Sequence, residues 1–151
     1  MTFLTLPPQD RSPQWIAQLT AVWEASVRAT HHFLDEAAIQ AIAPEVPQAL
    51  RQVPYLAVAV TEAGAPAGFL GVAGHTLEML FLGPEHLGTG LGAQLFHRGM
   101  ADCYIAQITV NEQNQRALDF YLRRSYKVHH RTPTDQQGRP YPLLYLTLSC
   151  Y

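Results

Sequence analysis

The most informative part of the sequence is a glycine-rich segment that reads Leu82-Gly83-Pro84-Glu85-His86-Leu87-Gly88-Thr89-Gly90-Leu91-Gly92-Ala93. An apolar run typical of a strand comes before it, and a helical pattern runs from Gly88 to about Met100. Glycines let a backbone approach a ligand closely, and the free N–H groups at the start of a helix attract anions. The segment therefore predicts a strand-to-helix turn suited to a pyrophosphate.

Two other phosphate-binding motifs fit these residues less well. The nucleotide P-loop requires Gly-Lys-Ser or Gly-Lys-Thr, and the segment contains no lysine. The dinucleotide fingerprint requires the spacing G-x-G-x-x-G inside a parallel βαβ unit, whereas these glycines stand at positions 88, 90 and 92. A tight turn that binds nothing stays open as the alternative on the glycines alone.

The rest of the chain predicts seven strands and four helices in one α+β domain over residues 1–151. The apolar runs are joined by short turn segments, so most neighbouring strands are expected to be antiparallel. Ser12 and Pro13 are typical of a helix start, and Pro44 and Pro47 interrupt the second helical pattern. The predicted strands cover 3–6, 55–60, 67–73, 77–82, 105–110, 126–131 and 143–148, and the predicted helices cover 13–30, 35–51, 88–100 and 113–123.

Composition narrows the class of protein. Of the 151 residues, 48% are hydrophobic and 15% are charged, as in an ordinary globular domain. The net charge of −2 without a long basic run argues against nucleic acid as a main partner. No stretch approaches the roughly 20 apolar residues of a membrane span. With two cysteines, Cys103 and Cys150, and no need of a disulfide framework at this length, the sequence predicts a cytoplasmic protein. The cysteines and the adjacent histidine pairs lack metal-ligand spacing, so no metal is expected.

A second pattern lies downstream, in Asn111-Glu112-Gln113-Asn114-Gln115-Arg116-Ala117-Leu118-Asp119-Phe120-Tyr121. Asn114 and Tyr121 are separated by about two helical turns, which places them on nearly one face of the predicted helix. Asn111 is suited to cap the start of this helix. A Phe-Tyr pair in a helix is commonly part of a core, and from these residues alone that alternative stays open.

Together the two patterns resemble the GNAT superfamily of N-acetyltransferases. The coenzyme A loop of that family has Arg or Gln, two residues, Gly, one residue, and then Gly or Ala. Gly90 and Gly92 match this loop, whereas Leu87 stands at its first position. The family's later signature is an Asn followed seven residues on by a Tyr, as in Asn114 and Tyr121. The resemblance runs from about position 55 to the end, and the segments 29–34, 111–121 and 135–144 resemble the small bacterial YjaB-like branch.

The resemblance implies a GNAT-like fold, a mixed and mostly antiparallel twisted sheet in which two central strands separate beside the cofactor. It also implies an enzyme that transfers the acetyl group of acetyl-CoA, a co-substrate, directly to a primary amine in a ternary complex. Tyr121 would donate its hydroxyl proton to the departing sulfur, and the thioester would lie along the strand 77–82. The cofactor-binding residues implied by the resemblance are Leu80, Phe81, Leu82, Gly88, Thr89, Gly90, Leu91, Gly92, Ala93 and Asn114.

The acceptor amine needs a proton acceptor, because an alkyl amine has a pKa of about 10. Glu78 is the candidate general base, since it interrupts an apolar strand beside the expected acetyl position; an exposed strand carboxylate is the alternative. His75 points to the opposite face of a regular strand unless a bulge intervenes. His31, next to His32 at a helix break, and Tyr141, between two prolines, are candidate substrate-binding residues. A solvated turn and strand packing are the respective alternatives.

The sequence leaves the acceptor open between a small-molecule amine and a peptide amine. The alternative function is a non-catalytic acyl-CoA-binding regulatory module, because Leu87 replaces the expected Arg or Gln and no single base stands out. A nucleotide-binding protein is a third candidate, and it would bind ATP or NAD in preference to coenzyme A. Small domains of this kind commonly dimerise, so a homodimer is a further expectation.

Overall fold

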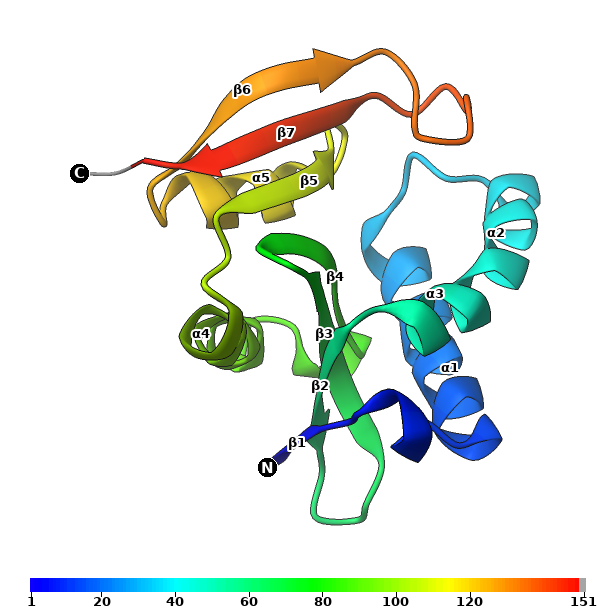
Figure 1. Ribbon diagram of the computed structural model, residues 1–151. Helices are drawn as coiled ribbons and strands as arrows, with labels where there is room; N and C mark the ends of the chain where they lie inside the picture. The colour runs from blue at the N-terminus through cyan, green and yellow to red at the C-terminus, as the bar shows by residue number, and fades with distance from the viewer. Residues whose placement is uncertain (150–151) are drawn as a thin grey trace.

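A computed structural model describes residues 1–149 and builds them on one seven-stranded sheet (Figure 1). Cys150 lies outside the described residues. The strand order is β1-β2-β3-β4-β5-β7-β6, and every neighbouring pair is antiparallel except β4 and β5, which are parallel. The prediction of seven mostly antiparallel strands is confirmed. The strands are β1 (Thr2–Thr5), β2 (Tyr55–Val60), β3 (Pro66–Ala73), β4 (Thr76–Leu82), β5 (Gln107–Asn111), β6 (Tyr126–Thr132) and β7 (Leu143–Leu148).

The helices follow the predicted segments, with one division. The Ser12 side chain accepts a hydrogen bond from the N–H of Trp15 and caps the first helix, as its position before Pro13 predicts. The predicted helix over 35–51 is divided by a short 3₁₀ turn, η2 (Ala43–Glu45), which contains Pro44. The helices are α1 (Pro13–Thr30), α2 (Glu36–Ile42), α3 (Val46–Gln52), α4 (Leu91–Cys103) and α5 (Gln115–Leu122), with further 3₁₀ turns η1 (Pro8–Asp10) and η3 (Pro84–His86).

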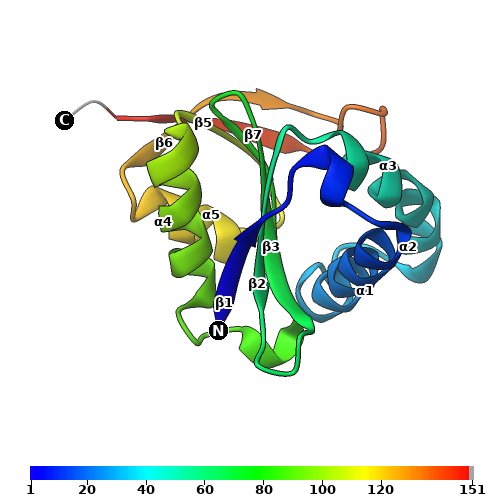
Figure 2. The same cartoon turned by 60° about the horizontal axis from the view of Figure 1, so that its bottom comes forward.

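Helices cover both faces of the sheet. Figure 2 shows the sheet nearly edge-on, with α4 and α5 on one side and α1, α2 and α3 on the other. Strand β2 contributes side chains to the cores on both faces of the sheet, because successive side chains of a strand point to opposite faces. Its residues Ala57 and Ala59 belong to the α4–α5 core, whereas Leu56, Val58 and Val60 belong to the α1–α3 core. No helix of residues 1–149 is long and apolar enough to cross a membrane.

The sheet opens between β4 and β5. These strands pair only at Thr76 with Gln107 and at Leu77 with Ile108, and they then separate. Strand β4 remains paired with β3 on its other side as far as Leu82. The expected separation of two central strands is therefore present, and it leaves one edge of β4 available to a ligand.

The ladder between β3 and β4 determines which main-chain groups face this opening. The N–H of Gly83 donates to the carbonyl of Ala67 at 2.8 Å, one position beyond the aligned pair Leu82 and Gly68. Because bonding alternates along an antiparallel ladder, the N–H and C=O groups of Leu80 and Leu82 point away from β3. They face the opening toward β5, where a thioester can bond to them.

A β-bulge interrupts β4 below the opening. Gly71 is aligned with Met79 and Val72 with Leu77, so Glu78 is an extra residue without a partner of its own on β3. Such bulges re-aim side chains, and alternation alone did not predict this one. His75 lies in the preceding turn, where its Nδ1 is 2.8 Å from the carbonyl oxygen of Cys103 at the end of α4. It belongs to the α4 side of the sheet, apart from Glu78.

Candidate active site

The glycine turn has a conformation that explains two of its glycines. Gly88 and Gly90 have φ angles of 75° and 88°, in the left-handed region that only glycine adopts without strain. Gly90 is the N-cap of α4, and its carbonyl accepts the first helical hydrogen bond, from Gln94. The N–H groups of the first helical turn after Gly90 have no helical carbonyl to bond, so the turn presents donors to an anion, as predicted.

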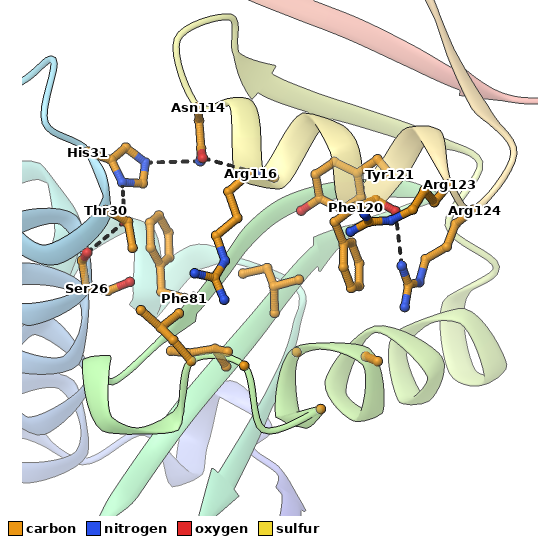
Figure 3. Close-up of a pocket in the computed structure, with 18 residues that line it drawn as sticks. Ser26, Thr30, His31, Phe81, Asn114, Arg116, Phe120, Tyr121, Arg123 and Arg124 are labelled. Atoms are coloured by element: carbon orange, nitrogen blue, oxygen red, sulfur yellow. Dashed lines mark hydrogen bonds between the residues drawn. The ribbon is translucent and has the colours of Figure 1, made fainter.

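A cavity of about 350 Å³ lies where this turn meets the opening of the sheet (Figure 3). Four segments contribute to its wall: the end of α1, strand β4, the glycine turn with the start of α4, and α5. We call this space the cofactor cavity, after the residues that the sequence predicts to bind the cofactor. Its lining consists of Ser26, Thr30, His31, Leu80, Phe81, Leu82, Leu87, Gly88, Gly90, Gly92, Ala93, Asn114, Arg116, Ala117, Phe120, Tyr121, Arg123 and Arg124.

Positive charge in the cofactor cavity comes from α5 and its end. Arg116, Arg123 and Arg124 line the cavity, and among the described residues no carboxylate does. Arg124 is held over the ring of Phe120, with its guanidinium carbon 3.5 Å from the ring centroid. Figure 3 shows the Arg116 side chain extending from α5 toward the glycine turn. These arginines could hold the phosphates of a cofactor, whereas Leu87 in the glycine turn offers no cationic group.

The sequence prediction missed these three arginines. Arg116 and Arg123 are separated by the same interval as Asn114 and Tyr121, so the two members of each pair lie at nearly the same angle around the predicted helix, although the two pairs occupy different faces. That spacing was the available signal. It went unused because charged residues on a helix are ordinarily solvated, and only the packing of α5 against the opening gives them a shared cavity.

Tyr121 lies in the wall of the cofactor cavity and is 6% exposed. Its ring packs among Phe96, Phe120 and Tyr126, with centroid separations of 5.4 to 6.5 Å. Burial raises the pKa of the Tyr121 hydroxyl above its ordinary value. The group therefore stays protonated near neutral pH and can act as a proton donor.

Asn114 is the N-cap of α5: its side-chain oxygen accepts a hydrogen bond from the N–H of Ala117 at 3.3 Å. The prediction that Asn111 caps this helix is wrong, because Asn111 is the last residue of β5 and α5 begins only at Gln115. Asn114 and Tyr121 nevertheless line the same cavity, at the two ends of α5. Asn114 also lies 3.4 Å from His31, measured from Nδ2 to Nε2.

A second cavity, of about 340 Å³, lies on the α1–α3 side of β4. Phe81 lines both cavities, so its ring forms part of the partition between them. We call this second space the acceptor cavity, after the role that the sequence predicts for Glu78 and Tyr141. Its lining consists of Trp23, Leu34, Ile42, Glu45, Val46, Ala49, Glu78, Met79, Phe81, Thr109, Asn111, Asp135, Gln136, Gln137, Arg139, Tyr141 and Leu143.

The acceptor cavity carries the opposite charge to the cofactor cavity. Arg139 pairs with Glu45 at 2.6 Å and lies 3.6 Å from Asp135, so two of the three lining carboxylates have a cationic partner. Glu78 is an exposed residue, as its sequence alternative states, and it has no ion-pair partner within residues 1–149. Partial desolvation against the cavity wall nevertheless raises the pKa of its carboxyl. A carboxylate so placed can attract a cation and accept its proton.

The structure divides the predicted site residues into three groups. Glu78 and Tyr141 lie together in the acceptor cavity, whereas His31 is buried in the wall of the cofactor cavity. Two predicted cofactor residues lie outside the cavity lining: Leu91 is buried in the α4–α5 core, and the Thr89 hydroxyl donates to the carbonyl of His86 at 2.6 Å. The other predicted cofactor residues, Leu80, Phe81, Leu82, Gly88, Gly90, Gly92, Ala93 and Asn114, line the cofactor cavity.

Comparisons with known proteins agree with this arrangement. The acetyltransferase (GNAT) domain family matches residues 21–141. Over 129 residues the chain is 38% identical to "Peptidyl-lysine N-acetyltransferase YjaB" of Salmonella typhimurium, which covers 85% of this chain and 88% of that protein. The solution structure of apo YjaB from Escherichia coli superposes with a TM-score of 0.81 at 33% identity, covering 97% of each chain. The PaiA N-acetyltransferase of Thermoplasma acidophilum, solved with coenzyme A, shares the fold at 19% identity and a TM-score of 0.66, over 96% of this chain and 98% of that one.

The fold and the site together define a coenzyme A-dependent acyltransferase. Its mixed sheet opens between β4 and β5, its glycine turn offers free N–H donors, and its two cavities meet at the ring of Phe81. The chain belongs to the GNAT acetyltransferase family. It is an acetyl-CoA-dependent N-acetyltransferase, which transfers an acetyl group from acetyl-CoA to an amine. The comparisons thus favour the enzyme over the alternative of a non-catalytic binding module.

Proposed function

We propose that this enzyme acetylates the ε-amino group of lysine side chains in peptides or proteins. The observation that carries the proposal is the contrast between the two cavities. The cofactor cavity is lined by three arginines, whereas the acceptor cavity holds Glu78 as a carboxylate without a cationic partner. An anionic cofactor and a cationic amine would therefore be drawn to opposite sides of the same ring, that of Phe81.

The acceptor cavity also suits the shape of a lysine. Its apolar wall includes Trp23, Leu34, Met79 and Leu143, which can cover an aliphatic stem. Glu78 supplies a carboxylate for the ammonium group beside that wall. The similar proteins from Salmonella typhimurium and Escherichia coli carry the name peptidyl-lysine N-acetyltransferase, which supports the same acceptor class.

The proposed reaction uses two side chains from opposite sides of the partition. Glu78 accepts a proton from the ammonium, directly or through a water, and the free amine attacks the thioester carbonyl. A main-chain N–H of β4 that faces the opening, from Leu80 or Leu82, donates to the carbonyl oxygen as negative charge develops there. The intermediate collapses, the C–S bond breaks, and the Tyr121 hydroxyl gives its proton to the departing sulfur, which leaves as the thiol of coenzyme A. The attacking nitrogen gives up its remaining extra proton, directly or through water, to the Tyr121 oxygen, which leaves a neutral amide and restores the hydroxyl.

We propose further that residues 1–151 act as one catalytic domain, since the cofactor cavity draws on segments from α1 to α5. A cytoplasmic location fits an enzyme that uses acetyl-CoA, a metabolite of the cell interior. The expected homodimer stays a prediction, which a sedimentation experiment can test.

The test is an acetylation assay with acceptors that differ only in their amine. A peptide with a blocked amino terminus and one lysine should gain one acetyl group in the presence of acetyl-CoA, as seen by mass spectrometry. The same peptide with arginine in place of lysine should gain none. A peptide with a free amino terminus and no lysine, and a small diamine, complete the panel. Acetylation of the small diamine without the lysine peptide would overturn the proposed acceptor class.

A further inference from the structure

His31 occupies a position that a substrate-binding role does not explain. It is the C-cap of α1, only 8% of its surface is exposed, and both ring nitrogens have partners. Nδ1 lies 2.8 Å from the Thr30 hydroxyl, and Nε2 lies 3.4 Å from the side-chain amide of Asn114. The neighbouring His32, in contrast, is exposed. A buried histidine bonded on both sides is an integral part of the wall.

The direction of each hydrogen bond follows from its neighbours (Figure 3). The Thr30 hydroxyl donates its one proton to the carbonyl of Ser26 at 2.8 Å, so toward His31 it can only accept. Nδ1 of His31 therefore carries the proton, and Nε2 is the acceptor. Asn114 fits this assignment, because its oxygen already caps α5 and its NH₂ group is left to donate to Nε2.

This chain of bonds joins segments that are far apart in the sequence. It begins at the carbonyl of Ser26 in α1, passes through Thr30 and His31, and ends at Asn114, the residue that caps α5. Helix α5 carries Tyr121, so the bonds connect the end of α1 to the helix that bears the proposed acid. The chain needs a neutral imidazole, and burial, assisted by the charge of His32, lowers the pKa of His31 to about 4.

The ring of His31 also lies against the partition between the two cavities. Its centroid is 6.1 Å from that of Phe81, which lines both cavities, and 5.3 Å from that of Phe33. Phe33 in turn packs against Tyr141 of the acceptor cavity, at 6.0 Å. A shift of His31 would therefore disturb both the cap of α5 and the ring that separates cofactor from acceptor.

We propose that His31 is a positioning residue. It holds Asn114 and the first turn of α5 against the end of α1, and so keeps the Tyr121 hydroxyl within reach of the thioester sulfur. This role rests on the proposed reaction but differs from the acceptor contact that the sequence suggested. Small misplacements of reacting groups can cost about a hundredfold in rate, so a purely geometric role has a measurable effect.

The first test compares His31→Leu with His31→Gln in the full chain. Leucine removes both hydrogen bonds, whereas the glutamine oxygen can take the place of Nε2 and accept from Asn114. We expect His31→Leu to lower kcat about tenfold or more and to weaken acetyl-CoA binding, while KM for the lysine peptide changes less than about twofold. We expect His31→Gln to recover most of both losses.

Other outcomes would overturn the proposal. A raised acceptor KM at unchanged kcat would mean that His31 contacts the acceptor. Loss of the acidic limb of the pH–rate profile in both variants would make His31 the base. A lower melting temperature with unchanged kinetics and acetyl-CoA affinity would mean a structural role alone.

A second measurement needs neither a folded leucine variant nor an identified acceptor. Nitrogen-15 NMR of the wild-type imidazole should show a neutral ring protonated at Nδ1 down to about pH 5, since its pKa is about 4. The variant Asn114→Asp keeps a capping oxygen but turns the NH₂ donor into a carboxylate, so the pKa of His31 should rise markedly. A wild-type ring protonated at Nε2, or an unchanged pKa in the variant, would contradict the proposal. Failure of the acetylation assay alone would count against the acceptor class and leave this result standing.

Discussion

Leu77 and Met79 lie two residues apart on β4 and yet pack on opposite faces of the sheet, Leu77 in the α4–α5 core and Met79 against the α1–α3 core. In a regular strand they would share a face. The bulge at Glu78 between them reverses the alternation. Because of the bulge, the Glu78 carboxylate lines the acceptor cavity, whereas Leu80 and Leu82, which follow the bulge, line the cofactor cavity.

The role of Glu78 can be tested by Glu78→Gln, which keeps the size of the side chain but cannot accept the proton. We expect kcat/KM for the lysine peptide to fall about a hundredfold at neutral pH. A base must be deprotonated to act, and partial desolvation raises the pKa of Glu78, so the wild-type rate should rise with pH through a value above the ordinary carboxyl range. Glu62→Gln, in an exposed turn, is the control. A rising limb that persists in Glu78→Gln would assign it to another group.

Tyr121→Phe tests the proton donor without changing the ring. We expect kcat to fall between about 10² and 10⁴-fold, since one acid is lost, while the dissociation constant of acetyl-CoA stays within about twofold. Because burial raises the pKa of Tyr121, the wild-type rate should show no loss assignable to this hydroxyl below about pH 10. Steady-state kinetics and calorimetric titration with acetyl-CoA give the two quantities. An unchanged kcat would remove Tyr121 from the mechanism.

The arginines on and after α5 predict an affinity that depends on phosphate. Replacing Arg116, Arg123 and Arg124 together by Gln should weaken acetyl-CoA binding about tenfold or more and flatten its salt dependence. Acetyl-pantetheine, which has no phosphate, should bind the variant and the wild type alike. Lys127→Gln, on exposed β6, serves as the control. Equal weakening of both ligands would indicate that the substitutions deform the cavity.

The glycine turn predicts unequal effects for two neighbouring substitutions. At Gly90 a φ of 88° strains any side chain, so Gly90→Ala should cost about 1 kcal/mol of stability and weaken acetyl-CoA binding. At Gly92 an added Cβ would lie 3.5 Å from Leu82, an ordinary contact in a helix, so Gly92→Ala should leave the affinity within about threefold. Thermal unfolding and titration calorimetry check both. Equal losses at the two positions would contradict the conformational explanation.

Arg11 predicts a large effect on stability far from the site. It is 7% exposed, and its guanidinium donates to the carbonyls of Leu6, Leu50 and Val53 at 2.6 to 3.0 Å. Arg11→Met leaves these buried acceptors without donors, so the free energy of unfolding should fall by about 3 kcal/mol in urea titration. The control Arg131→Gln breaks a largely exposed pair with Glu112 and should cost less than about 1 kcal/mol. A loss of similar size in the two variants would mean that the buried carbonyls find water.

Local sequence patterns predicted most of the helices and strands of the fold. The apolar runs and their turns predicted the seven strands, and the glycines predicted the turn before α4, because periodicity and backbone preference act within a few residues. Boundaries were less accurate: β5 begins at Gln107, not at position 105, and α4 begins at Leu91, after the glycines. At such ends the hydrogen bonds to other segments, which no local pattern contains, decide where an element starts.

What the sequence determined by itself is therefore the set of elements and the family motifs at the cofactor: Gly90, Gly92, Asn114 and Tyr121. Tertiary structure alone decided which side chains share a cavity. The bulge turned Glu78 toward the acceptor, Arg139 reached Glu45 across 94 residues, and His31 met Asn114 across 83. The physical reason is that strand register and packing against the sheet set these contacts, and both depend on the whole chain rather than on the neighbours of each residue.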